Sequence, residues 1–156
     1  STVFVETMTA TPRDLYDELI LDHSKQPRNF GPLANHTHHA DGRNPICGDE
    51  ISVYLDLDEL LLKGIAFSGQ GCAISKASAS LMTEDLKNCT IAQIKDRVEE
   101  IMKLLTEESE SDAFAQFGGL AALTGVRSYP ARVKCATLPW HTVLAALSGK
   151  FSASTE

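Results

Sequence analysis

Three cysteines and one aspartate carry the clearest chemical signal in this sequence, because together they form a candidate four-ligand metal site. They are Cys47, Asp49, Cys72 and Cys135. Three thiolates and a carboxylate suit Zn²⁺ or an iron of an iron–sulfur cluster, and they do not suit Mg²⁺ or Ca²⁺. Structural zinc sites usually close with four Cys or His ligands, so an aspartate in the fourth place indicates a position that can be given up during function.

The local sequence explains how the first three of these residues could work. Cys47 and Asp49 flank Gly48, so a tight turn can direct both side chains to the same side. Cys72 follows a Gly-Gln-Gly string and begins an expected helix. Free N–H groups and the helix dipole at such a position favour a thiolate, which is both a ligand and a nucleophile.

The third cysteine lies among cations. Cys135 is expected near the start of the final helix, close to Arg132 and Lys134. Two positive charges can stabilise a thiolate or an incoming persulfide. The alternative interpretation is that both cations are solvated charges on the helix surface.

Other metal-binding residue types have simpler explanations. Cys89 has no flanking glycine turn, carboxylate or adjacent basic residue, so it is predicted to be structural and is excluded from the site. His36, His38 and His39 form either a second metal cluster or, more simply, part of a polar loop or edge strand.

Composition places these residues in one small domain. With 156 residues, of which 43% are hydrophobic, the chain can bury one core. Residues 1–10 are expected to be a disordered tail, residues 11–150 a single domain and residues 151–156 a C-terminal tail. No apolar run is long enough to span a membrane, so a cytoplasmic protein with free thiols is expected. A net charge of −7 argues against nucleic-acid binding and favours a protein partner with basic patches.

The N-terminal half predicts a helix followed by a small sheet. Thr11 can cap a helix that has Pro12 at its first position and ends at Pro27. Residues 34–43 could form a polar edge strand. Alternating apolar residues over 51–57, and a second run over 60–67, predict a hairpin around Asp58 and Glu59. The result is an antiparallel sheet of about three strands.

The C-terminal half predicts helices. Residues 73–86 lack Gly and Pro, and Asn88 is a suitable stop. Thr90 is expected to cap a strongly periodic helix that ends before the acidic stretch at residues 107–112. Residues 113–124 form a shorter apolar segment, and Pro130 opens a last helix that ends at Gly149.

Four strings in the chain closely resemble the IscU/NifU-like iron–sulfur assembly proteins. They are Asp22 to Asn29, Asn44 to Asp49, Gly69 to Ser75 and Ala77 to Met82, within a resemblance that spans residues 15–147. The similarity is greatest to the SufU branch, because the third cysteine stands in Arg132-Val133-Lys134-Cys135 and a long stretch separates it from Cys72. The resemblance implies an α+β fold, with a small antiparallel β-sheet packed against several α-helices and a metal site at an exposed end.

The resemblance also implies a function. SufU-like proteins hold Zn²⁺ with three cysteines and an aspartate, and they accept persulfide sulfur from a pyridoxal-phosphate cysteine desulfurase of the SufS type. Carried over, Cys47, Asp49, Cys72 and Cys135 would bind zinc. Docking of the desulfurase would free Cys47 to attack the persulfide, and Arg132 would help to hold the site or the sulfur. Downstream iron–sulfur assembly proteins would be further partners.

Two rival functions use the same residues. The chain could be a scaffold on which a [2Fe-2S] cluster is assembled and transferred, with Asp49 as a weaker ligand that eases release. IscU scaffolds carry a histidine before the third cysteine and a chaperone motif, where this chain has Lys134 and the string Tyr129 to Val133. A merely structural zinc is the other alternative, and it predicts that metal removal unfolds the protein.

Overall fold

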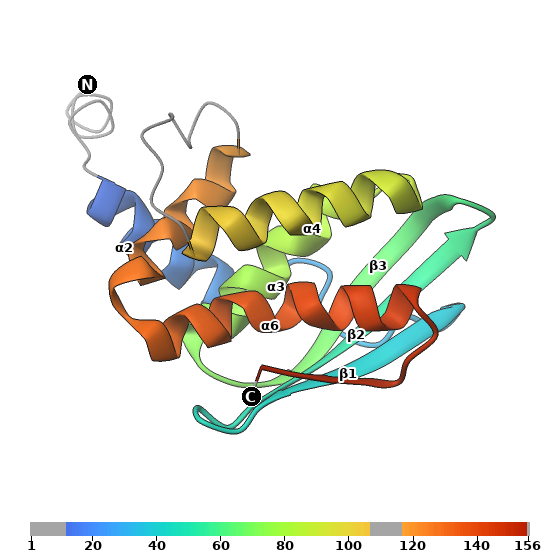
Figure 1. The fold of residues 1–156 in the computed structure, drawn as a ribbon, viewed down its shortest axis with the longest axis horizontal. Coiled ribbons are helices and arrows are strands. Elements are labelled where there is room, and N and C mark those ends of the chain that lie inside the picture. Colours follow the sequence, from blue (N-terminus) through green and yellow to red (C-terminus); the bar gives the residue numbers. More distant parts are fainter. Residues whose placement is uncertain (1–11, 107–116, 156) are drawn as a thin grey trace.

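The computed structural model describes residues 12–106 and 117–155. The tail expected over residues 1–10, the cap expected at Thr11 and the acidic stretch over residues 107–112 lie outside this range. A four-stranded sheet is covered on one face by helices, as Figure 1 shows. No helix among the described residues is long and apolar enough to cross a membrane.

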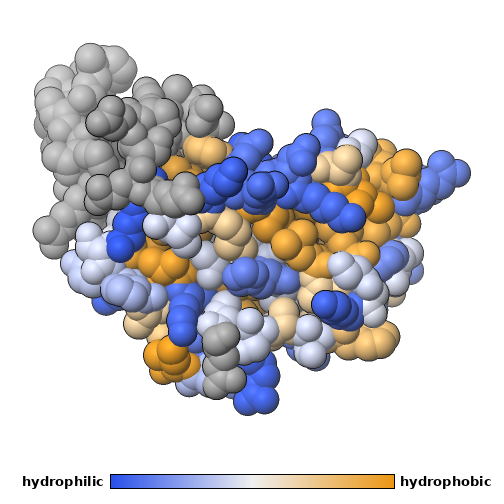
Figure 2. Space-filling view, viewed as in Figure 1, coloured by the Kyte–Doolittle hydropathy of each residue, from blue (hydrophilic) through white to orange (hydrophobic). Residues whose placement is uncertain are grey.

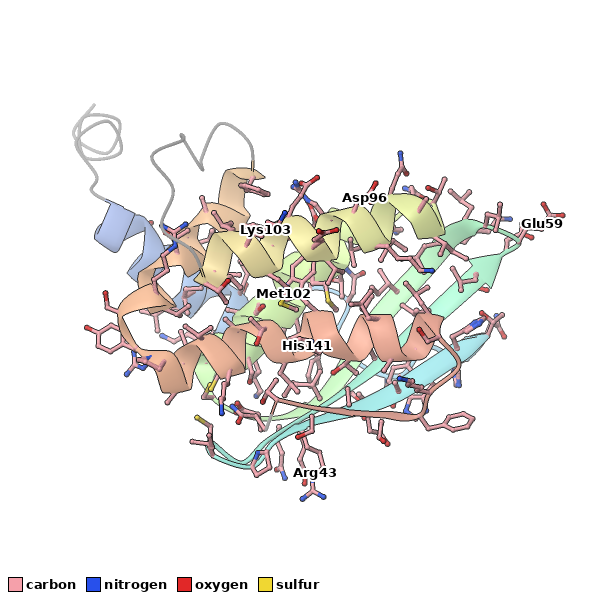
Figure 3. All side chains as sticks on the ribbon, in the orientation of Figure 1. Arg43, Glu59, Asp96, Met102, Lys103 and His141 are labelled. Carbon is pink, nitrogen blue, oxygen red and sulfur yellow. The ribbon has the colours of Figure 1, made fainter. Side chains whose placement is uncertain are left out.

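The sheet is built around the predicted hairpin. Strand β2 (Asp49–Asp58) pairs antiparallel with β3 (Leu61–Gln70), and β1 (His38–Asn44) pairs antiparallel with the other edge of β2. Glu59 adopts a positive φ of 57° in the turn, at the tip of the hairpin in Figure 3. The hairpin and its turn are therefore confirmed.

The C-terminal segment adds a strand that the sequence did not predict. Residues 151–156 were expected to be a tail, but β4 (Ser152–Ser154) pairs parallel with β1, and the strand order is β3-β2-β1-β4. The sheet thus has four strands, and the pairing of β4 with β1 is parallel. The edge position expected for β1 was wrong, because β4 covers that edge between Asp41 and Arg43.

One face of the sheet supplies the core. Alternate residues of β2 are buried, including Ile51, Val53 and Leu55, as the period of two in the sequence requires. Their partners from the helices include Trp140 and Met82, both fully buried. A core of this size lets the domain fold around its own apolar side chains.

The helices occupy nearly the predicted ranges. They are α2 (Pro12–Lys25), α3 (Ala73–Leu86), α4 (Ile91–Thr106), the 3-10 helix η1 (Gly118–Ser128) and α6 (Pro130–Leu147). Thr90 and Gln93 form a reciprocal capping pair at the start of α4, with backbone-to-side-chain distances of 2.8 and 3.2 Å. Figure 2 shows hydrophilic residues along the outer side of α4, whereas Arg97 of this helix is partly buried and donates two hydrogen bonds to Asp85 of α3. Only residues 117–124 of the apolar segment predicted over 113–124 are described, and η1 begins at Gly118 within them.

Small polar residues join the helices that carry the cysteines. The Ser78 hydroxyl on α3 donates to the Ala136 carbonyl on α6 at 2.6 Å and accepts from the Trp140 indole N–H at 3.0 Å. On the other side of α3, the Ser80 hydroxyl lies 2.7 Å from Nδ1 of the buried His23 on α2. These buried bonds fix α3 between α2 and α6.

Candidate metal centre

Three chain segments meet at one end of the sheet. The loop over residues 45–48 joins β1 to β2, with Asn44 and Asp49 paired opposite each other at its base. Gln70 pairs with Glu50, so the end of β3 and the start of α3 lie beside this loop. The first turns of α6 supply Cys135. The fold therefore gathers residues that are far apart in the sequence.

All four predicted ligands lie in this region. One ligand atom from each of Cys47, Asp49 and Cys135 falls within 4.8 Å of the other two. Cys72 lies outside this group of three but beside it, since its Sγ is 3.9 Å from Asp49 Oδ2. In a tetrahedral site with bonds of roughly 2.0–2.3 Å, ligand atoms stand about 3.3–3.8 Å apart, so small side-chain movements would close the four atoms around one ion.

The carboxylate of Asp49 is held on both oxygens. The backbone N–H of Cys72 donates to Oδ1 at 2.8 Å, and the side-chain N–H of Asn44 donates to Oδ2 at 3.3 Å. The same Asn44 amide donates to Cys135 Sγ at 3.4 Å. Asp49 is 1% exposed, so its orientation depends on these donors.

The glycines of the Gly-Gln-Gly string make this approach possible. Gly69 has a φ of +124°, and a Cβ there would lie 2.0 Å from the Glu50 carbonyl oxygen. At Gly71, a Cβ would lie 2.7 Å from Asp49 Oδ1. Any side chain at Gly71 would push against the carboxylate, and this is the physical reason for glycine before Cys72.

The four residues differ strongly in access. Cys135 and Asp49 are each 1% exposed, Cys72 is partly buried and Cys47 is exposed. A cavity of about 440 Å³ opens beside the cysteines. It is lined by Ile20, Leu21, Cys47, Cys72, Ala73, Ile74, Arg132 and Cys135.

The two inner thiols influence each other. Hydrogen bonding with Cys135 lowers the pKa of Cys72 to about 6, and the start of α3 and Ser75 contribute. The same hydrogen bond, followed by burial, raises the pKa of Cys135. Of the two inner thiols, Cys72 is therefore the more acidic.

The predicted cation also faces the site. Arg132 lines the cavity, and its guanidinium stacks on the Tyr129 ring at 5.3 Å from the centroid. This stacking limits the guanidinium's freedom while leaving its N–H groups available. Lys134 is half-buried and does not line the cavity.

The remaining candidates lie elsewhere. Cys89 belongs to the turn between α3 and α4, next to the start of β3, and its thiol faces the Asp85 carbonyl at 3.7 Å. His39 stacks on Tyr54 at 4.9 Å and bonds Asp41 at 2.9 Å, and His36 packs edge-on against the same Tyr54. Within the described residues, no three-residue metal group includes a histidine.

Two contributors were missed by the sequence analysis. Asn44 appeared there only as the first residue of a string that resembles the family, yet its buried amide contacts two of the predicted ligands. Ile20 and Leu21, in the helix predicted to end at Pro27, were given no role in the site, although they line the cavity. The signal for Asn44 was its place two residues after Gly42 and four after Ala40, on the inward face of a strand.

An α+β fold that brings three thiols and a carboxylate to one end defines a small protein that can hold a thiophilic metal ion or handle sulfur. The chain belongs to the family of NifU-like N-terminal domains, whose family model matches residues 15–136.

Individual relatives agree with this assignment. The zinc-dependent sulfurtransferase SufU of Bacillus subtilis strain 168 is 41% identical over 129 residues, covering 83% of this chain and 86% of that protein. The iron–sulfur cluster assembly scaffold protein IscU of Thermotoga maritima is 38% identical, covering 85% and 92%. A structure described as an iron–sulfur cluster assembly scaffold for the SUF system of Fervidobacterium islandicum AW-1 has a TM-score of 0.78 at 32% identity, covering 85% and 96%. The predicted family and α+β fold class are confirmed.

Proposed function

We propose that this protein is a zinc-dependent sulfurtransferase of iron–sulfur cluster biogenesis that accepts persulfide sulfur on Cys47. The carrying observation is the contrast in access: Cys47 is exposed, whereas its neighbours Asp49 and Cys135 are each 1% exposed. A protein-bound persulfide can approach an exposed loop and cannot reach a thiol inside the core. The similarity to a relative named as a zinc-dependent sulfurtransferase supports the proposal.

The proposed zinc ligands are Cys47, Asp49, Cys72 and Cys135. The donor set supports this, since ligand atoms of Cys47, Asp49 and Cys135 lie within 4.8 Å of one another and Cys72 Sγ lies 3.9 Å from Asp49 Oδ2. When bound, zinc keeps its thiolates deprotonated and shields them from oxidation. Asp49 is held by Cys72 N–H and Asn44 and so presents a fixed oxygen.

The proposed transfer is a thiol–disulfide exchange. The Cys47 thiolate attacks the outer sulfur of the desulfurase persulfide, a new S–S bond forms at Cys47, and the bond to the desulfurase cysteine breaks. The desulfurase cysteine leaves as a thiolate, so electrons and charge balance. Arg132, at the wall of the same cavity, is proposed to stabilise the negative charge on the sulfur.

The partner follows from this chemistry. We infer that a SufS-type cysteine desulfurase supplies the persulfide and that downstream iron–sulfur assembly proteins receive the sulfur. The free cysteines of the site suit a reducing compartment, so we place the reaction in the cytoplasm.

The test is persulfide formation at a single residue. Protein loaded with zinc would be incubated with a SufS-type desulfurase and cysteine, and the added sulfur would be located by mass spectrometry of peptides. Cys47→Ser should lose the modification and the stimulation of the desulfurase, whereas the matched variant Cys89→Ser should keep both. Arg132→Gln should slow transfer while zinc content is retained. Unchanged transfer in Cys47→Ser would refute Cys47 as the acceptor.

A scaffold function is the second candidate. The cavity of about 440 Å³ beside three cysteines has room for a small cluster, and relatives such as the Thermotoga maritima protein are named as scaffolds. Anaerobic incubation with iron and sulfide separates the two functions. A visible chromophore that transfers to an apo-ferredoxin, together with no zinc-dependent stimulation of the desulfurase, would favour the scaffold.

A further inference from the structure

The side chain of Asn44 makes hydrogen bonds only to residues of the candidate metal centre. It is fully buried, and its amide N–H groups donate only to Asp49 Oδ2 and Cys135 Sγ. Its carbonyl oxygen Oδ1 is buried without a hydrogen-bond partner among the described residues. An unsatisfied buried acceptor costs free energy, so an apolar residue would serve the core better.

The orientation of the amide follows from its neighbours. The opposite orientation would place a carbonyl oxygen against the Asp49 carboxylate, and two acceptors repel each other. The N–H groups must therefore face Asp49 and Cys135, and Oδ1 must face away from them. The unsatisfied oxygen is the consequence of pointing both donors at the site.

The position of Asn44 in the sheet gives these bonds a mechanical effect. Asn44 and Asp49 are the last pair of the β1–β2 ladder, and the loop that carries Cys47 runs between them. The side-chain bond thus closes the base of the loop and reaches across to α6 through Cys135. It ties the paired ends of β1 and β2 to α6, which the strand pairing does not reach.

We propose that Asn44 is a positioning residue for the metal centre, which holds Asp49 and Cys135 in one fixed arrangement and leaves Cys47 as the movable member. The inference rests on the proposed zinc function. Outer hydrogen bonds of this kind orient metal ligands, and their loss typically lowers metal affinity about 10- to 100-fold. The donors themselves stay with Asp49 and Cys135 when Cys47 moves.

The experiment compares Asn44→Leu, which keeps the branched shape without donors, with Asn44→Ala, which cannot overpack the site. The matched control is Thr83→Val, which removes the bonds that the buried Thr83 hydroxyl makes with Asn29, Arg28 and Ser80, none of them ligands. Zinc affinity would be measured by competition with a chelator. The absorption spectrum of the Co²⁺-substituted protein would report ligand geometry, and thermal unfolding of the metal-free protein would report the fold.

Both Asn44 variants should bind zinc about 10- to 100-fold more weakly and shift the Co²⁺ spectrum, while unfolding no more easily than Thr83→Val. The control should lose thermal stability and keep wild-type affinity and spectrum. Wild-type affinity and spectrum in both Asn44 variants would overturn the inference alone. Failure of the wild-type protein to bind zinc would instead defeat the proposed function, and the inference with it.

Discussion

Gly71→Ala tests whether the geometry around Asp49 is as tight as the structure requires. A Cβ at this position would lie 2.7 Å from Asp49 Oδ1, 3.2 Å from Asp49 Cβ and 2.6 Å from Ser75 Oγ. The Ser75 hydroxyl can rotate away at little cost. Asp49 cannot, because it is buried and its two oxygens accept from Cys72 and Asn44.

The magnitude follows from the bond that must be lost. A hydrogen bond to a charged group contributes about 1.5–3 kcal/mol. Replacing glycine with alanine returns about 0.4–1 kcal/mol by restricting the unfolded chain. The metal-free variant should therefore be less stable by roughly 0.5–2.6 kcal/mol, which lowers the Tm of a domain of this size by about 1–10 °C.

The assay pairs thermal unfolding with zinc affinity from chelator competition. Gly71→Ala should also bind zinc more weakly, because Asp49 can no longer accept both hydrogen bonds, from Cys72 and Asn44, that fix its orientation. Gly64→Ala is the matched control: its Cβ would meet only Leu33 and Asp56 side chains at 3.3 and 3.4 Å, so both measurements should stay near wild type. Unchanged Tm and affinity in Gly71→Ala would refute a fixed Asp49.

Three further outcomes are expected. Ser78→Ala should cost about 1–3 kcal/mol, because it leaves the Trp140 indole N–H unpaired and removes the hydrogen bond to the Ala136 carbonyl, as urea titration would show. Burial, followed by the nearby Arg28, lowers the pKa of His23 from 6.5. Because the unfolded imidazole binds a proton at a higher pH than the folded one, stability should be full above pH 6.5 and fall as the pH drops toward the folded-state pKa. The fall should be less steep in His23→Asn. Removal of zinc should lower the Tm yet leave cooperative unfolding in circular dichroism, and loss of all structure would instead favour a structural zinc.

Much of the fold could be predicted because periodicity and caps are local signals. The period of two in β2 marks a strand with one buried face, and the Thr90–Gln93 pair marks the start of α4. Pro130 opens α6 because its missing N–H is not needed in a first turn. Each feature depends on residues within one turn or one strand of each other.

The missed features depend on long-range pairing. Ser152–Ser154 show no apolar alternation, and they form a strand only because β1 offers its backbone groups, as in the Asp41 N–H to Phe151 carbonyl bond of 2.9 Å. Asn44 is likewise unremarkable in a Pro-containing turn. Its role becomes visible only when the β1–β2 register places it opposite Asp49 and α6 brings Cys135 alongside.

Access, rather than acidity, distinguishes the proposed sulfur acceptor from the other thiols. Hydrogen bonding with Cys135 lowers the pKa of Cys72 to about 6, so Cys72 is the more acidic of the two inner thiols in the metal-free protein. Bound to zinc, however, every ligating thiol would be a thiolate, so that advantage would disappear. Attack on a persulfide held by another protein then requires a sulfur atom that is exposed and can reach the partner. A lower pKa is also no advantage by itself, because the nucleophilicity of a thiolate falls as its pKa falls. Cys47 meets this requirement because its loop is exposed while the Asn44–Asp49 bond anchors the base of that loop.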